Sequence, residues 1–191
     1  KEGNAVLEYE GKQYRIIHRD SPICGRVSIG QGREIIYARE DNFFLENYEM
    51  AKKEFEDLDL DNEKDIVEFL KEVRDIVEDA FSKAGDPSTE KLKNRIVPLS
   101  ELAKRGGVCR HINLLAAMIL EKLSEEYDLG WRVSLDRKNS YSEPHAFCRV
   151  EINGKAYVVD GALDYVGKVI SDFEAEDVLG ASGRVFQHFC V

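Results

Sequence analysis

The stretch RGGVCRHINLLAAMILEKL, residues 105–123, decides the fold of this chain. Two glycines precede a cysteine, and apolar residues then recur at intervals of three and four, which predicts a helix from Cys109 to about Tyr127. The backbone N–H groups and the dipole at a helix N-terminus favour negative charge, so a thiol placed there favours its thiolate form. The pattern predicts a reactive cysteine at the start of a buried helix.

Two strands joined by a tight turn follow this helix. Residues 145–152 alternate between apolar and polar, Asn153-Gly154 is a strong hairpin turn, and residues 156–160 form the next strand. If the turn closes tightly, His145 and Asp160 share one face of the hairpin within about two positions of each other. We therefore expect a hydrogen bond between His145 and Asp160.

Cysteine, histidine and aspartate in this order are typical of a nucleophile, its base and the residue that orients the base. We predict that Cys109, His145 and Asp160 are catalytic, with the N–H of Cys109 as first oxyanion donor. Each residue also has a structural interpretation: Cys109 as a buried thiol, His145 as a histidine of the core, and Asp160 as the cap of a turn. Asp164 is the rival orienter beyond the strand end, whereas His111 points away from Cys109 on a helix and is expected to support packing.

Three motifs in this region resemble the transglutaminase-like superfamily. They are Gly-Gly-Val-Cys-Arg at 106–110, His-Ala-Phe at 145–147 and Asn-Gly-Lys-Ala-Tyr-Val-Val-Asp at 153–160, and the resemblance covers about residues 99–167. It implies a papain-like cysteine-protease topology with catalytic order Cys, His, Asp. It also implies attack of Cys109 on an amide carbonyl of a protein or peptide substrate, giving a thioester.

The acceptor that resolves the thioester decides the activity. Water gives a peptidase or deamidase, a hydrolase of the thiol-protease type, and an amine gives an acyltransferase; the hydrolase is favoured because it needs no second substrate. Peptide N-glycanases rank low, since their zinc-binding cysteine pairs are absent here. The alternatives are a catalytically inactive module that binds basic protein partners, and the catalytic part of a secreted effector or toxin.

The rest of the chain predicts an α+β fold, a papain-like core with one central helix on an antiparallel sheet. Residues 1–88 form an extension, strand-like over 5–39 and helical over 41–85, and residues 89–191 form the catalytic core. We also predict a helix end at Gly85-Asp86-Pro87 and a polar loop at 136–143. The tail from residue 170 is expected to contain a short acidic helix and a strand near 184–186. Both predicted N-terminal helices have an apolar face. The apolar faces are Leu45, Tyr48, Met50 and Phe55 on a first helix, and Ile66, Phe69, Leu70, Val73, Ile76, Val77 and Phe81 on a second.

Composition limits the function classes. The chain has 191 residues, 43% of them hydrophobic, and a formal net charge of −10, which argues against nucleic-acid binding. No apolar run is long enough to span a membrane. The chain starts at Lys1 and not at Met, which we interpret as an excised fragment or a processed form. Nothing in the sequence predicts the oligomeric state.

The cysteine pattern favours free thiols and a reducing, cytoplasmic location over a disulfide framework. Besides Cys109, we interpret Cys24 as a neutral loop thiol and Cys148 as structural, and give Cys190 and His188 no role. The acidic loop at 57–61, with Glu68, imitates a calcium loop. An N-cap at Asp61 or Asn62 explains most of it, so no metal and no cofactor is predicted.

Overall fold

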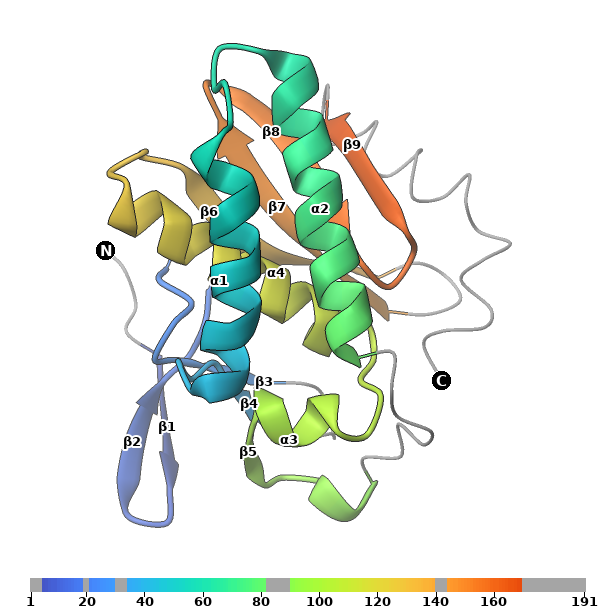
Figure 1. Ribbon diagram of the computed structural model, residues 1–191. Helices are drawn as coiled ribbons and strands as arrows, with labels where there is room; N and C mark the ends of the chain where they lie inside the picture. Colours follow the sequence, from blue (N-terminus) through green and yellow to red (C-terminus); the bar gives the residue numbers. More distant parts are fainter. Residues whose placement is uncertain (1–4, 19–20, 30–33, 82–89, 140–143, 170–191) are drawn as a thin grey trace.

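The computed structural model describes residues 5–18, 21–29, 34–81, 90–139 and 144–169. At its centre lies α4 (Cys109–Glu126), between a pair of helices and a sheet (Figure 1). Leu114, Leu115, Met118 and Ile119 are fully buried, so this helix is apolar on nearly all sides over its middle turns. A helix that is apolar all round belongs inside a protein, which is the expected place of the central helix.

The sheet beneath α4 is a four-stranded antiparallel meander. Its strands, in spatial order, are β6 (Arg132–Asn139), β7 (Pro144–Ile152), β8 (Lys155–Asp160) and β9 (Tyr165–Val169). The β7–β8 hairpin closes as predicted, with Ile152 opposite Lys155 and a left-handed Asn153 in the turn. The structure thus places residues 145 and 160 near one end of the same hairpin.

One prediction for this sheet was wrong, and one of its strands was not predicted. Residues 136–139 belong to β6 and not to a polar loop, because their main chain pairs with Pro144–Phe147 in the ladder with β7. Polar side chains on an edge strand can face solvent while the backbone still pairs, so the residue types concealed the strand. The sequence analysis also missed β9, which pairs along β8 from Ala156 to Asp160.

Helices α1 (Asn42–Glu56) and α2 (Glu63–Phe81) pack against each other and cover α4 (Figure 1). Asp41 caps α1 by accepting from Phe44 N–H, and Asn62 accepts from Lys64 N–H at the start of α2, as expected. The buried stripe of α2 matches the prediction except at Ile76, which is only partly buried.

The predicted buried face of α1 was partly wrong. Leu45 and Met50 are 41% and 45% exposed, whereas Phe44, Asn47 and Ala51 face inward together with Tyr48 and Phe55. The polar Asn47 is buried because its side chain donates to the Phe43 carbonyl one turn earlier. Apolar residues on both sides of this helix left its inward face ambiguous in the sequence.

The remaining elements form two small sheets and two short helices. β1 (Val6–Tyr9) and β2 (Lys12–Arg15) make a hairpin, and β3 (Val27–Ile29), β4 (Ile35–Tyr37) and β5 (Ile96–Pro98) make a sheet in the order β3-β4-β5. β5 runs parallel to β4 and leads through α3 (Leu99–Ala103) toward α4, after a short 3-10 turn at Glu90–Leu92. The β4–β5 pairing brings Glu34, the residue before β4, toward the start of α4.

The predicted α+β class is confirmed, with helices and mainly antiparallel sheets in one fold. The papain-like part of that expectation and the division at residue 88 stay predictions; one hydrophobic core runs from Ile23 to Val159. No helix among the described residues is long and apolar enough to cross a membrane. The helix end predicted at 85–87, the tail from 170, Cys190 and His188 lie outside the described residues.

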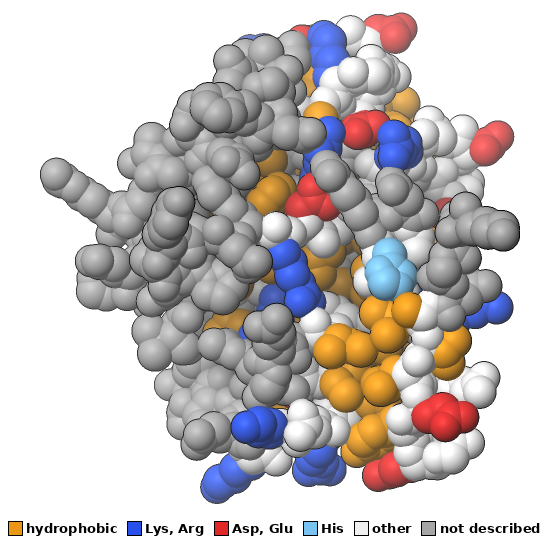
Figure 2. Space-filling view, turned by 180° about the vertical axis from the view of Figure 1, so that it is seen from behind, with side chains coloured by type: hydrophobic (Ala, Val, Ile, Leu, Met, Phe, Trp, Pro, Cys, Tyr) orange, Lys and Arg blue, Asp and Glu red, His pale blue; other side chains and the backbone are white. Residues whose placement is uncertain are grey.

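The net charge does not make every face of the molecule acidic. Figure 2 shows one face on which basic side chains and a hydrophobic patch lie close together near the middle. A net charge of −10 therefore says little about any single site on this surface.

Candidate functional site

The start of α4 depends on two glycines with left-handed backbone. Gly106 and Gly107 have φ of 97° and 54°, which lets the chain turn sharply before Val108, the N-cap residue. A Cβ added at Gly107 would overlap the ring of Phe81 at the end of α2, so this position also requires a residue without a side chain. The turn places Cys109 at the first position of the helix.

The structure brings together all three residues that the sequence predicted. The Nε2 atom of His145 lies 2.5 Å from Oδ2 of Asp160, and a further hydrogen bond joins His145 to the side chain of Cys109. Because Asp160 contacts Nε2, the other ring nitrogen, Nδ1, is the one that can bond to the Cys109 sulfur. Cys109, His145 and Asp160 are 6%, 2% and 0% exposed, so these contacts are shielded from bulk water.

The environment of His145 favours its protonated form. Burial alone would lower the pKa of the ring, but the hydrogen bonds and charges of Asp160 and Cys109 outweigh it and raise this pKa to about 9. At neutral pH the ring is therefore an imidazolium, and a cation beside the Cys109 sulfur favours its ionised form. Asp160 orients this ring from its other side.

Asn113 connects the three elements that carry these residues, and the sequence analysis missed it. Its side-chain nitrogen donates to the Ala146 carbonyl (2.7 Å) and to Oδ1 of Asp160 (2.9 Å), and its oxygen accepts from Gly161 N–H (2.9 Å). These three partners lie on β7, on β8 and in the turn after β8, respectively. A polar residue one helical turn after Cys109, on a face that is otherwise apolar, was the signal in the sequence.

A second buried polar group flanks Cys109. Glu34, which is fully buried, pairs with Arg110 through its Oε1 atom and accepts from Nε2 of His111 at 2.6 Å. The Nδ1 atom of His111 accepts from Val108 N–H at 3.0 Å, at the N-cap of α4. Burial lowers the pKa of His111 despite Glu34, so the neutral ring has one donating and one accepting nitrogen, as these two contacts require.

The other residues considered in the sequence lie away from this group. Asp164, the rival orienter, is exposed and pairs with Arg74 at 2.9 Å. Burial raises the pKa of the Cys148 thiol, and burial with the neighbouring Glu121 raises that of Cys24, so both are neutral. The described cysteines Cys24, Cys109 and Cys148 are all free thiols.

Residues of the acidic loop before α2 cap helix ends and accept hydrogen bonds from backbone N–H groups. Asp57 caps the end of α1, Asp59 accepts from Asp61 N–H, and Asn62 caps α2. Within the described ranges, the acidic residues close enough to share an ion are Asp75, Glu78 and Asp164, which are exposed and outside this loop.

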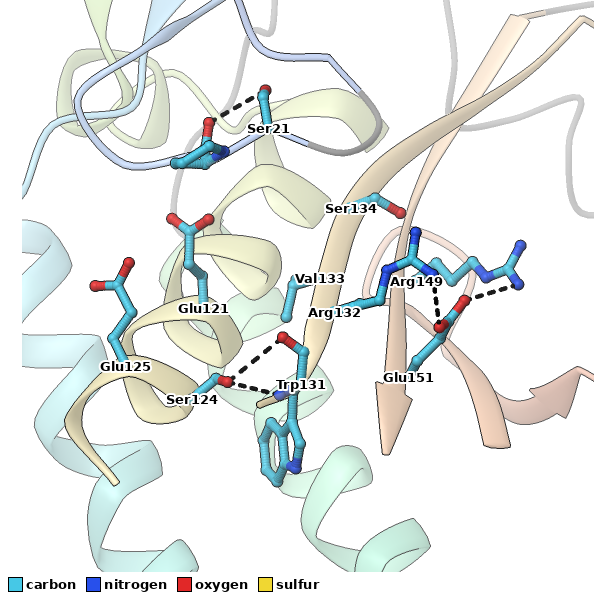
Figure 3. Close-up of a pocket in the computed structure, with 11 residues that line it drawn as sticks. Ser21, Glu121, Ser124, Glu125, Trp131, Arg132, Val133, Ser134, Arg149 and Glu151 are labelled. Atoms are coloured by element: carbon cyan, nitrogen blue, oxygen red, sulfur yellow. Dashed lines mark hydrogen bonds and ion pairs between the residues drawn. The ribbon is translucent and has the colours of Figure 1, made fainter. Parts of the chain in front are cut away.

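A separate cavity of about 270 Å³ lies at the opposite end of α4 (Figure 3). Glu121, Ser124 and Glu125 reach it from α4, while Arg149 and Glu151 reach it from β7. Fifteen residues of helix separate Ser124 from Cys109, a length of about 22 Å. This cavity is therefore not part of the group around Cys109.

Comparison with known families points to one match. The sequence model of a family described as N-acetyltransferase matches residues 86–170, just under half of the chain, and this span contains Cys109, His145 and Asp160. No curated protein and no solved structure shows a significant match. The family match supports an enzyme of the transferase class with acyltransferase activity.

The resemblance to the transglutaminase-like superfamily was wrong, because the family that matches is an N-acetyltransferase family. The reason lies in the chemistry of the motifs. Enzymes of several families that carry an acyl group on a cysteine use a thiol, a base and an orienting group in similar positions. Short motifs around these three residues therefore indicate the chemistry better than they identify the family.

Proposed function

We propose that this chain is an acyltransferase that carries the acyl group as a thioester on Cys109 and passes it to the nitrogen of an amine. The observation that carries the proposal is the buried contact of His145 with Asp160 and Cys109 at the start of α4. The N-acetyltransferase match supports nitrogen as the acceptor atom.

In the first half of the reaction, the Cys109 thiolate attacks the carbonyl carbon of an activated acyl donor. The tetrahedral oxyanion forms beside the first turn of α4, where the Cys109 N–H is the expected donor and the helix dipole favours negative charge. Collapse of this intermediate breaks the bond to the leaving group, which takes the proton of the His145 imidazolium. The products are the thioester on Cys109 and a neutral His145.

In the second half, the amine nitrogen attacks the thioester carbonyl while His145 accepts a proton from the nitrogen. The carbon–sulfur bond then breaks, giving the amide and the thiolate–imidazolium pair again. Asp160 holds the ring in one orientation through both proton transfers, and Asn113 holds Asp160. Every group in this sequence returns to its starting state.

The sequence favoured a peptidase or deamidase because hydrolysis needs no second substrate, but the N-acetyltransferase match supports transfer of the acyl group instead. A protein or peptide as the substrate and a cytoplasmic location stay predictions. An inactive binding module is the alternative, but the intact contacts between Cys109, His145 and Asp160 do not favour it.

Transfer to an amine can be tested with p-nitrophenyl acetate as donor, measuring p-nitrophenol release and the N-acetyl product by mass spectrometry. Hydrazine suits as the first acceptor because it is much less basic than an alkylamine, so a useful fraction of it is free base near neutral pH. We expect release to accelerate with hydrazine concentration, with N-acetyl product accounting for the increase. Release that is independent of the amine, with acetate as the product, would show a hydrolase and contradict the proposal. Cys109→Ala provides the background rate.

A further inference from the structure

Arg137 on β6 faces the start of α4. In the β6–β7 register it lies opposite Ala146, the residue after His145, and Ala146 in turn accepts from Asn113 of α4. Side chains alternate along a strand, so Arg137 shares a face with Val133 and Leu135, which pack in the core beneath α4. Register and alternation together direct this arginine toward the turn that carries Cys109.

Two hydrogen bonds hold the guanidinium in place. Nη1 donates to the Ile29 carbonyl at 2.8 Å and Nη2 donates to Ser28 Oγ at 3.0 Å, both on β3. A guanidinium has five N–H donors, so these contacts fix its orientation and leave donors for another partner. Both acceptors are neutral, which means that neither compensates its charge.

The charged groups that act on Arg137 are Arg110 and Cys109. Within the described part of the chain no carboxylate bonds to Arg137, and Glu34 is already paired with Arg110. Although the residue is exposed, the surrounding protein partly desolvates its guanidinium; this desolvation and then the charge of Arg110 lower the pKa of Arg137, and the charge on Cys109 acts in the opposite direction. When the thiolate becomes a neutral thioester, that opposing charge disappears and Arg137 faces the acyl group without a counter-ion.

We propose that Arg137 is an anion subsite beside Cys109, and that the preferred acyl group carries a carboxylate a few bonds from its reacting carbonyl. The inference rests on the proposed function, since it names the acyl class that Cys109 carries. Arginine suits this role because its planar fork can bind a carboxylate through two parallel hydrogen bonds. Arg137 is exposed, so a substrate group can reach it.

Alkylation of Cys109 by iodoacetate and by iodoacetamide tests the subsite without any substrate. Both reagents report the thiolate, whereas only iodoacetate carries a carboxylate, so their rate ratio at one pH isolates the anion preference. We expect Arg137→Gln to lower the iodoacetate-to-iodoacetamide ratio about fivefold and Arg137→Lys to restore most of it. Arg132→Gln, on the same strand but paired with Glu151, serves as the control and should keep the wild-type ratio. An unchanged ratio in Arg137→Gln, including equal slowing with both reagents, would overturn the proposal.

Acylation by two active esters tests whether the carboxylate belongs to the acyl group. We expect p-nitrophenyl glutarate, with its free carboxylate, to acylate Cys109 faster relative to p-nitrophenyl acetate in the wild type than in Arg137→Gln. Equal preference in both proteins would overturn the acyl assignment. These results are distinguishable from failure of the proposed function, in which neither ester would acylate Cys109 at all.

Discussion

The buried part of α4 has a polar half, residues 109–113, and an apolar half, residues 114–120. The first turn carries Cys109, Arg110, His111 and Asn113, whereas the following turns, 114–120, are apolar. The polar side chains of the first turn reach partners on other elements: Glu34, His145 and Asp160. Buried polar groups cost free energy unless they are hydrogen-bonded, so the polar half needs specific partners. The apolar half needs only side chains that fill the core. This difference agrees with the proposed chemical role of residues 109–113 and with a packing role for residues 114–120.

Removal of the nucleophile should have the largest effect on activity. In Cys109→Ala we expect no detectable acyl transfer, because no atom remains to carry the thioester. The free energy of unfolding should change little, since alanine fits the space of the thiol. Cys148→Ala is the matched control, a buried thiol outside the site, and should retain acylation. Acyl transfer that persists in Cys109→Ala would place the nucleophile elsewhere.

Substitutions of the two partners of Cys109 should reduce acylation next. His145→Ala and Asp160→Asn remove the base and its orienting charge, and each should slow acylation by about 10²–10⁴-fold. The measurement is p-nitrophenol release in a single turnover. If His145→Ala acylates at the wild-type rate, the contact between ring and sulfur has no catalytic role.

A substitution in the apolar half should show the opposite pattern. Leu115→Ala leaves a cavity under a fully buried side chain and should cost about 2–5 kcal/mol of unfolding free energy. The acylation rate per folded molecule should stay near the wild-type value. Chemical denaturation and single-turnover kinetics on the same preparation separate the two effects. A large loss of rate in the folded variant would contradict the division of α4.

Asn113 lies at the boundary between the halves, so its substitution should affect both properties moderately. Asn113→Ala leaves Asp160 and the Ala146 carbonyl without this donor, at a cost of about 1–3 kcal/mol. We expect acylation to slow about tenfold, because Asp160 loses one of the groups that fix it. Asn113→Asp, which keeps an acceptor for Gly161 but removes the donors, should not restore the rate.

Stability should also depend on pH through His145, without any substitution in the site. Its folded pKa of about 9 lies above the usual 6.5, so its contribution is fully present below pH 6.5 and is lost as pH rises through 9. The unfolding free energy of the wild type relative to His145→Gln should therefore fall between pH 6.5 and 9. A difference that stays constant over this window would mean that the folded ring is neutral.

Much of the polar half could be predicted from the sequence because its signals are local. A Gly-Gly turn, a cysteine and an apolar period are sufficient to predict where α4 begins, and the Asn153-Gly154 turn alone determines the β7–β8 register. From that register, the neighbouring positions of His145 and Asp160 follow by geometry. The hydrogen bond predicted between them is confirmed.

The partners missed in the sequence come from distant elements. Glu34 reaches Arg110 and His111 because β4 pairs with β5, and Arg137 is held by β3 across the molecule. No spacing rule relates residues so far apart in the chain. The family could not be assigned correctly either, because different families use the same three groups for acyl transfer on a thiol.

Intact mass spectrometry after reaction with p-nitrophenyl acetate tests the central claim most directly. The account predicts that the protein gains the mass of one acetyl group, that peptide mapping locates it on Cys109, and that an added amine removes it as the N-acetyl product. An acetyl group found on another residue, or one on Cys109 that no amine removes, would contradict the account.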